Sequence, residues 1–224
     1  MRARFTVTAF VSLLASACGT NRPDIPDYLL KDDAGSAAGY PSGPYAASLN
    51  DKGLPIEDIE FAKGWLDPKA DGYDPAKLVS IRLSDFYDPD GSKGHELLML
   101  NTAAGWCGAC KNEHEGTGTN PSLGEHAAEL APKGLVVLSG LFEDGNFQPA
   151  QEKHLVAWAK TYETNFPFVL DPTYKLGTKF APKDVAPLNL IVDAKTMKLL
   201  LGTTGDKSEV IWPFVVGELE KRGK

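Results

Sequence analysis

Residues 96–110 read ELLMLNTAAGWCGAC, and this stretch contains the strongest indications of the fold in the sequence. Its first part, residues 96–101, is an apolar run typical of a strand that is buried on both faces. A helix is expected to begin at about Cys107. Sheets of this kind place their chemistry beyond the carboxyl end of a strand, where the next helix begins. The sequence therefore predicts that Cys107 and Cys110 lie at such a point.

The pattern on both sides of this stretch predicts an α/β domain. Before it, residues 59–65 and 77–83 alternate in polarity, as edge strands of a lead-in hairpin do. After it we expect helices and strands in turn, with Pro149 in a first helical position and Pro213 in a first turn or at a kink. This order implies a mixed central sheet flanked by helices on both faces. The expected helices are 122–130, 149–163 and about 208–221, and the expected strands are 134–142, 166–171, 188–193 and 197–204.

The two cysteines have the spacing of a redox-active dithiol. At a helix start, this spacing brings both side chains onto the same edge, so that they can close a disulfide. Unpaired amides and the helix dipole stabilise a thiolate on Cys107, which lowers its pKa below the free value of about 8.5. We therefore expect Cys107 to attack a partner disulfide and Cys110 to resolve the mixed disulfide.

Other uses of the cysteine pair fit the sequence less well. A closed zinc site needs two further ligands, and the chain has no other cysteine beyond Cys18. A purely structural disulfide is disfavoured because so short a loop restricts the unfolded chain very little. The histidines form no pair with usual ligand spacing, although His114 and His126 follow the motif closely enough to leave transient metal binding open. The four histidines are His95, His114, His126 and His154, and no resident metal is expected.

The turn DPDGSKGHE (88–96) contains three carboxylates, Asp88, Asp90 and Glu96. Their spacing lacks the ladder of oxygen ligands that an EF-hand loop presents to calcium. A solvated turn is the expected structure.

The segment NTAAGWCGACKNE (101–113) resembles the active-site segment of thioredoxin-fold proteins, and within them the TlpA and ResA branch of envelope thiol-disulfide oxidoreductases. The resemblance covers about residues 55–222. Three further segments resemble that branch: a lead-in strand and loop over 83–101, the following strand over 134–144, and a cis-proline strand and hairpin over 185–202. The resemblance implies a thioredoxin-like fold with a lead-in hairpin.

The resemblance also implies roles for residues around the dithiol. Pro187 would be the cis-proline that faces the disulfide, with Ala186 presenting backbone for substrate pairing. Trp106, which directly precedes Cys107, is expected to support the site. Glu113 matches an acidic residue of this branch, and a carboxylate there can modulate the thiol pKa values and shuttle the proton released when Cys110 attacks. A solvated helix carboxylate is the alternative.

Three positions depart from the family pattern. Asn101 stands where cytosolic thioredoxins have a buried acid, and an amide cannot exchange protons, so that task is vacant or falls to Glu113. Ala109 replaces the proline that is common between the cysteines, which leaves the reduction potential and the direction of electron flow open. The segment GTGTNP (116–121) lengthens and loosens the helix after the motif, which leaves the substrate groove open.

The composition limits the classes of partner. The chain has 224 residues with 42% apolar and 24% charged residues, as an ordinary globular protein has. Its 23 basic and 30 acidic residues give a formal charge of −7. Binding to a phosphate backbone needs a basic footprint, so nucleic acid is not an expected partner.

The first residues form an export signal. Arg2 and Arg4 precede an uncharged apolar stretch over 5–17, which is too short to span a bilayer, and small residues lead up to Cys18. LLASAC (13–18) resembles the lipobox of bacterial lipoproteins, which implies a lipid on Cys18; secretion with cleavage nearby is the alternative. We therefore divide the chain into a signal peptide (1–17), a tether (18–47) and a thioredoxin-like domain (48–224). The alternative for the tether's second half is packing on the domain through residues such as Tyr40 and Tyr45.

These observations lead to one functional prediction. The chain is expected to be a lipid-anchored thiol-disulfide oxidoreductase of the cell envelope, which reduces disulfides of exported or membrane-bound proteins. It would need no cofactor beyond its own dithiol and would receive electrons from a membrane thiol donor. Two alternatives stay open. A peroxiredoxin-like peroxidase would want a threonine at the position of Ala104, and a copper-handling or binding lipoprotein would use the same fold without catalysis.

Overall fold

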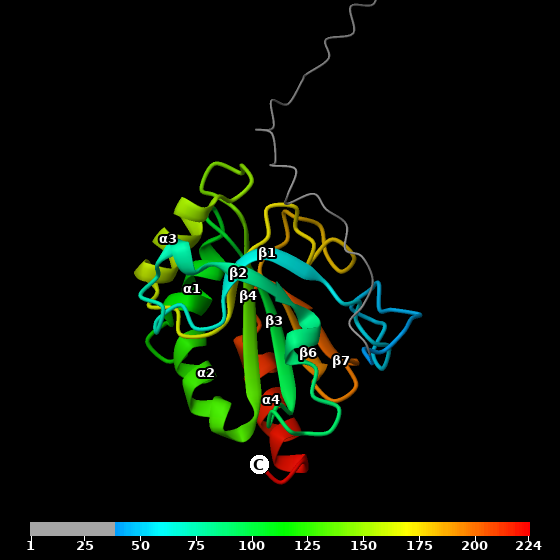
Figure 1. The fold of residues 1–224 in the computed structure, drawn as a ribbon. Helices are drawn as coiled ribbons and strands as arrows, with labels where there is room; N and C mark the ends of the chain where they lie inside the picture. Colours follow the sequence, from blue (N-terminus) through cyan, green and yellow to red (C-terminus); the bar gives the residue numbers. More distant parts are fainter. Residues whose placement is uncertain (1–38) are drawn as a thin grey trace, which may run out of the picture.

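The computed structural model describes residues 39–224, so Cys18 and the signal peptide lie outside the described residues. In these residues, seven strands form one sheet, and four α-helices connect or follow its strands (Figure 1). The strands are β1 (Glu60–Trp65), β2 (Val79–Arg82), β3 (Leu97–Ala104), β4 (Leu135–Glu143), β5 (Phe168–Leu170), β6 (Leu188–Asp193) and β7 (Leu199–Thr204). The α-helices are α1 (Gly108–Glu115), α2 (Leu123–Leu130), α3 (Glu152–Thr161) and α4 (Ser208–Lys221).

The sheet is mixed, with the order β2-β1-β5-β4-β3-β6-β7. Strands β3, β4 and β5 are parallel, whereas β1, β2, β6 and β7 join through antiparallel pairs. Every residue of β3 is buried, as its apolar run predicts. The α/β class with a mixed central sheet, flanking helices and a lead-in hairpin is therefore confirmed.

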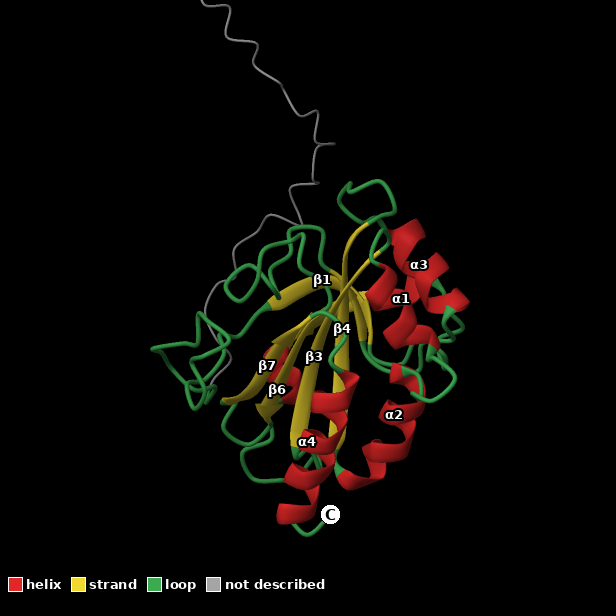
Figure 2. Cartoon of the chain, turned by 180° about the vertical axis from the view of Figure 1, so that it is seen from behind, coloured by secondary structure: helices red, strands yellow, loops and turns green. Residues whose placement is uncertain are grey.

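The α-helices lie on one face of the sheet, not on both as the element order suggested (Figure 2). Leu97 and Met99 of β3 pack with α2 and α4, whereas Leu98 and Leu100 point to the opposite face. The crossovers from β3 to β4 and from β4 to β5 step in the same direction across the sheet. Because such crossovers are right-handed, both place their helices on the same face. The opposite face is covered by the segment before β1, a short 3-10 helix (Leu83–Phe86) and part of the segment between β5 and β6.

The segment before β1 packs onto that opposite face. Tyr40 is buried, and its hydroxyl donates a hydrogen bond to the carbonyl oxygen of Ile56 (3.1 Å). Ala46 is also buried, and its N–H donates to the carbonyl oxygen of Pro55 (2.8 Å). The folded part of the chain therefore extends back to Tyr40, before the predicted domain start at residue 48. Packing of the second half, the alternative to a tether, describes residues 40–46 better.

Two local predictions are wrong, and of the two alternatives given for Pro213 the place in the first turn is wrong. Strand β1 is not an edge strand, because it lies between β2 and β5. Pro149 precedes α3, which begins after Gln151, because residues 149 and 150 bond back to the end of β4. Pro213 lies in the second turn of α4. A proline there removes a hydrogen bond to the carbonyl oxygen of Glu209, a residue that is exposed to water.

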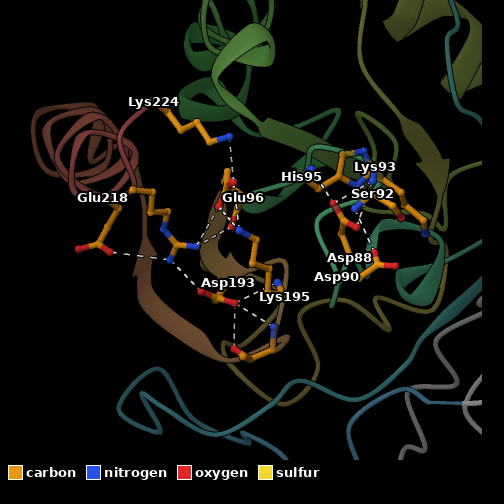
Figure 3. Close-up of polar contacts among 12 residues, drawn as sticks. Asp88, Asp90, Ser92, Lys93, His95, Glu96, Asp193, Lys195, Glu218 and Lys224 are labelled. Atoms are coloured by element: carbon orange, nitrogen blue, oxygen red, sulfur yellow. Dashed lines mark hydrogen bonds and ion pairs between the residues drawn. The ribbon is translucent and has the colours of Figure 1, made fainter.

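An ion-pair cluster at the amino end of β3 holds the C-terminus (Figure 3). The buried carboxylate of Glu96 lies 2.9 Å from Lys195 Nζ and 3.2 Å from Lys224 Nζ. Arg222 donates to the carboxylate of Asp193 at 2.8 Å. The chain end is thereby joined to the β6–β7 turn, at the end of β3 opposite the cysteines.

The DPDGSKGHE turn lies beside this cluster (Figure 3). The carboxylate of Asp88 is buried and accepts hydrogen bonds from the backbone N–H groups of Lys93 and His95. Asp90 is exposed. The expected solvated turn is therefore correct for Asp90 and wrong for Asp88, which holds the loop together.

Among residues 39–224, no helix has the length and apolar character needed to cross a membrane.

Candidate active site

The cysteine pair lies at the N-terminus of α1, directly after β3 (Figure 1). Cys107 caps the helix, and its Sγ accepts a hydrogen bond from the N–H of Cys110 at 3.1 Å. The two side chains form a disulfide, with their Cα atoms 5.3 Å apart. Cys107 is 3% exposed and Cys110 is completely buried. Both cysteines are therefore buried in the oxidised protein, and Cys107 is the one with residual exposure.

The β3 backbone and the proline strand form the floor of the site. Cys110 Sγ lies 3.9 Å from the carbonyl oxygen of Thr102, and the Thr102 hydroxyl accepts a hydrogen bond from the N–H of Leu188 at 2.9 Å. The Ala186–Pro187 peptide bond is cis, as the resemblance implies. Ala186 packs against the cluster that contains both cysteines. The cis-proline strand is thus joined directly to the strand that precedes the dithiol.

Glu113 is held between two asparagines, and is not a solvated helix carboxylate. Its Oε2 accepts from Asn101 Nδ2 at 3.0 Å, and its Oε1 accepts from Asn189 Nδ2 at 2.9 Å. Asn101 also donates to Asn189 Oδ1 (2.7 Å) and accepts from the Ser139 hydroxyl (2.6 Å). Three strands, β3, β4 and β6, thereby contribute polar side chains to one hydrogen-bonded group around the partly buried Glu113. Asn101, which cannot exchange protons itself, holds the residue that can.

Burial raises the pKa of Glu113 to about 8. The charge of Asp206 raises this pKa further, whereas the hydrogen bonds from Asn189 and Asn101 oppose the shift. In the described part of the chain, no cation pairs with this carboxylate to favour its charged form. A carboxyl group that titrates near neutral pH can accept and release a proton under ordinary conditions.

Trp106 is positioned by a carboxylate of the neighbouring strand. Its indole Nε1 donates to Glu143 Oε2 at 2.9 Å, and Lys183 Nζ lies 3.8 Å from Glu143 Oε1. The ring also stacks on Phe147, with the ring centroids 5.0 Å apart. Sequence reasoning missed Glu143, Phe147 and Asn189. For Asn189, the sequence offered one signal, an asparagine within an apolar strand, as at Asn101. The structure shows that these two asparagines pair across β3 and β6.

The histidines that follow the motif do not form a metal site in the structure. His114 is buried among aromatic rings, and its Nδ1 accepts a hydrogen bond from Trp158 Nε1 at 3.2 Å. Burial lowers the pKa of His114 to about 3, so the ring is neutral at physiological pH. His126 instead stacks on Trp212, at a centroid distance of 3.7 Å. Within residues 39–224, no group of three or more His, Cys, Asp or Glu side chains is arranged to hold a metal ion.

Comparison with solved structures identifies the fold. A thiol:disulfide interchange protein DsbE from Chlorobium tepidum has a TM-score of 0.53 and 18% identity, over 75% of this chain and 98% of that one. A secreted thiol-disulfide isomerase from Corynebacterium glutamicum has a TM-score of 0.53 and 17% identity, over 73% and 84%. AhpC from Enterococcus faecalis also has a TM-score of 0.53, with 16% identity over 78% and 93%.

These identities are low, so the likeness concerns the arrangement of the elements. No family model and no curated protein sequence matches the chain. Each of these neighbours aligns over nearly three quarters of this chain or more. The chain therefore has a thioredoxin-like fold, with its cysteine pair at the start of the helix that follows the central strand β3.

Proposed function

We propose that this chain is a thiol-disulfide oxidoreductase that works through Cys107 and Cys110. The observation that carries the proposal is their disulfide at the N-terminus of α1, in a cluster against which Ala186 packs, directly before cis-Pro187. Helix N-termini favour thiolates, so the N-cap Cys107 suits the attack and Cys110, one turn further along α1, suits the resolution. The thiol-disulfide proteins among the structural neighbours support the same chemistry.

The proposed reaction is a two-electron exchange. The Cys107 thiolate attacks one sulfur of a substrate disulfide, which breaks the S–S bond and releases the first substrate thiol. Cys110 then loses its proton and attacks Cys107 Sγ, which releases the second substrate thiol and leaves the Cys107–Cys110 disulfide. The substrate gains two electrons and the dithiol loses two. A thiol donor must reduce the pair before the next turnover.

Glu113 is the proposed acceptor of the Cys110 proton. Both residues belong to α1, three positions apart, and therefore project from the same side of the helix. Both also contact consecutive residues of β3, since Cys110 meets Thr102 and Glu113 meets Asn101. A carboxyl group with a pKa of about 8 matches the pKa of an ordinary thiol far better than a solvated carboxylate does.

The location and the partners are part of the proposal. The signal-like residues 1–17 and the lipobox-like LLASAC support export and a lipid on Cys18. The substrates would then be disulfides of exported or membrane-bound proteins, and a membrane thiol donor would return the pair to its reduced state. That one structural neighbour is a secreted isomerase is consistent with this location.

Insulin reduction tests the proposal. With dithiothreitol as donor, the full chain should accelerate precipitation of the insulin B chain, and Cys107→Ser should abolish the acceleration. Cys110→Ser should lose turnover but accumulate a mixed disulfide on Cys107, which a gel without reductant detects. Turnover in Cys107→Ser at the wild-type rate would refute the proposal. Proteins captured on Cys110→Ser in cells would identify the substrates.

A peroxidase is the second candidate, because AhpC shares the fold to the same degree. Peroxiredoxins have a threonine three residues before the reactive cysteine. In this chain that position is the buried Ala104, which has no hydroxyl group. We therefore expect reduced protein to consume hydrogen peroxide no faster than free dithiothreitol does. Peroxide consumption that depends on Cys107 and exceeds insulin reduction would favour the peroxidase.

A further inference from the structure

An exposed aromatic ring lies beside the dithiol and has no role in the proposed reaction. Phe147 is 63% exposed, which is the highest value among the large apolar side chains of residues 39–224. Its ring stacks on Trp106, the residue before Cys107, with centroids 5.0 Å apart and ring planes 18° from parallel. Trp106 covers part of one face of this ring, and much of the remaining surface meets water.

The loop that carries Phe147 holds the ring in this exposed position. Phe147 has a φ of 60°, in the left-handed region that bulky side chains rarely adopt. The loop is closed by a hydrogen bond from Asp144 N–H to the Gln148 carbonyl oxygen (2.8 Å). The Asp144 carboxylate also accepts from the N–H groups of Asn146 and Gln148. The hydrogen-bonded loop therefore keeps the Phe147 ring exposed to water, although an apolar ring is more stable when it is buried.

The same loop is joined to the active site by backbone contacts. Gly105, which precedes Trp106, approaches the loop so closely that a Cβ atom on it would lie 2.6 Å from Gly145 N. Gly105 N–H also donates to the Glu143 carbonyl oxygen at 2.8 Å. The loop and the dithiol segment thus form one rigid surface. Val185, which is 38% exposed, directly precedes Ala186 and cis-Pro187.

From this arrangement we propose that Phe147 is a substrate-binding residue, which contacts an apolar side chain next to the cysteine of a polypeptide disulfide. The inference rests on the proposed function and narrows its substrate class. Contact with an apolar side chain removes apolar surface of both partners from water, which favours binding. A small charged disulfide, such as oxidised glutathione, has little apolar surface to offer this ring. The enzyme should therefore prefer polypeptide segments that expose apolar residues beside their cystine.

Two synthetic peptides test the proposal with the full chain, reduced and in detergent. Each peptide has one central cysteine in a mixed disulfide with thionitrobenzoate. In one peptide the cysteine is flanked by phenylalanine and leucine, in the other by serine and glycine. Each turnover oxidises the dithiol to the Cys107–Cys110 disulfide by two electrons and releases the peptide thiol and thionitrobenzoate. No thiol donor is added, so each reduced molecule reacts once. The absorbance of the released thionitrobenzoate, followed with each peptide in excess over a range of concentrations, gives the second-order rate constant of this single turnover, which is used as kcat/KM.

The wild type should prefer the apolar peptide, and Phe147→Ala should lower kcat/KM for this peptide about tenfold, which corresponds to about 1.4 kcal/mol. The rate with the polar peptide should stay within about twofold. Phe147→Asn should behave like the alanine variant, because asparagine tolerates the left-handed backbone and preserves the loop. Phe147→Tyr should keep the preference.

Leu66→Ala is the matched control, because Leu66 is 52% exposed and directly follows β1, which β5 and β4 separate from β3 in the sheet. This variant should leave both rates unchanged. Equal wild-type rates with both peptides, or a preference that survives in both Phe147→Ala and Phe147→Asn, would overturn this inference alone. If the proposed function itself is wrong, the wild type will react with neither peptide faster than Cys107→Ser does.

Discussion

Replacement of Glu113 by glutamine should remove a specific loss of stability at alkaline pH. Burial raises the pKa of Glu113 to about 8 in the folded protein, whereas an unfolded glutamate titrates near 4.5. The folded state therefore holds the proton more tightly than the unfolded state does. This contribution to stability is fully present below about pH 4.5 and is lost as the pH rises through about 8.

The size of the loss follows from linkage. Between pH 7 and pH 9 the unfolded state binds almost no proton at this position, whereas the folded state releases its proton around the midpoint of the interval. The free energy of unfolding should therefore fall by about 1.4 kcal/mol over these two pH units. With a urea m-value of about 2 kcal/mol/M, the midpoint of unfolding should fall by about 0.7 M.

Urea unfolding followed by tryptophan fluorescence measures this loss. The oxidised protein is used, so that the cysteines do not titrate. Asp171, whose pKa burial raises to about 7, contributes a smaller loss in the same direction, but this loss is common to wild type and variant. In Glu113→Gln, the fall of about 1.4 kcal/mol in the free energy of unfolding between pH 7 and pH 9 should be absent. Glu115→Gln, at an exposed position of the same helix, is the control and should retain it.

Parallel decline of wild type and Glu113→Gln between pH 7 and pH 9 would refute the reasoning. Glu113 would then ionise well below pH 7, despite its burial between Asn101 and Asn189. A carboxylate that is always charged could not accept the proton of Cys110 near neutral pH. The proton would then have to leave through water at the mouth of the site.

Three further predictions concern other parts of the chain. Labelling with a fatty-acid analogue should mark the wild type and not Cys18→Ala, and equal labelling of both would argue for secretion without an anchor. His114→Phe should lessen the loss of stability in acid, because burial lowers the pKa of His114 to about 3 in the folded protein. As the unfolded histidine gains its proton between pH 7 and pH 4.5, the free energy of unfolding of the wild type should fall by about 2.5 kcal/mol. Urea midpoints at these two pH values measure this fall, and an equal fall in wild type and variant would contradict the prediction. Glu96→Gln should lower the unfolding temperature at pH 7 but much less at pH 3. Burial alone would raise the pKa of Glu96, but the hydrogen bonds and charges of Lys195 and Lys224 together outweigh it and hold this pKa below its usual value, so the stabilisation is lost as the pH falls. Calorimetry measures the difference, and an equal effect at both pH values would show that the ion pairs are unimportant.

The central elements were predictable because their signals are local. The apolar run before Asn101 predicts a buried strand, and the helix after the motif begins at Gly108, capped by Cys107. The second helix has its capping box at Ser122 and Glu125, where a serine followed by an acid predicts it. In each case, residues within a few positions of one another determine the structure.

The remaining features depend on contacts between distant segments. Strand β1 is an inner strand because β5, which comes about a hundred residues later in the chain, pairs with it. The cover of the second face depends on residues such as Tyr40, in a stretch whose composition is typical of a tether. Glu143 ends an apolar strand, and nothing in its neighbourhood predicts that it binds the indole of Trp106. Local patterns do not contain this information.

The two sides of the dithiol are built from different chemistry. On the solvent side, Trp106 and Phe147 form an aromatic surface beside Cys107, held by Glu143 and a rigid loop. On the inner side, Asn101 and Asn189 hold a carboxyl group beneath the helix that carries Cys110. No hydrogen bond in residues 39–224 joins the two groups directly. In the proposed reaction, the solvent side would govern which disulfide Cys107 attacks, and the inner side would govern how readily Cys110 releases its proton.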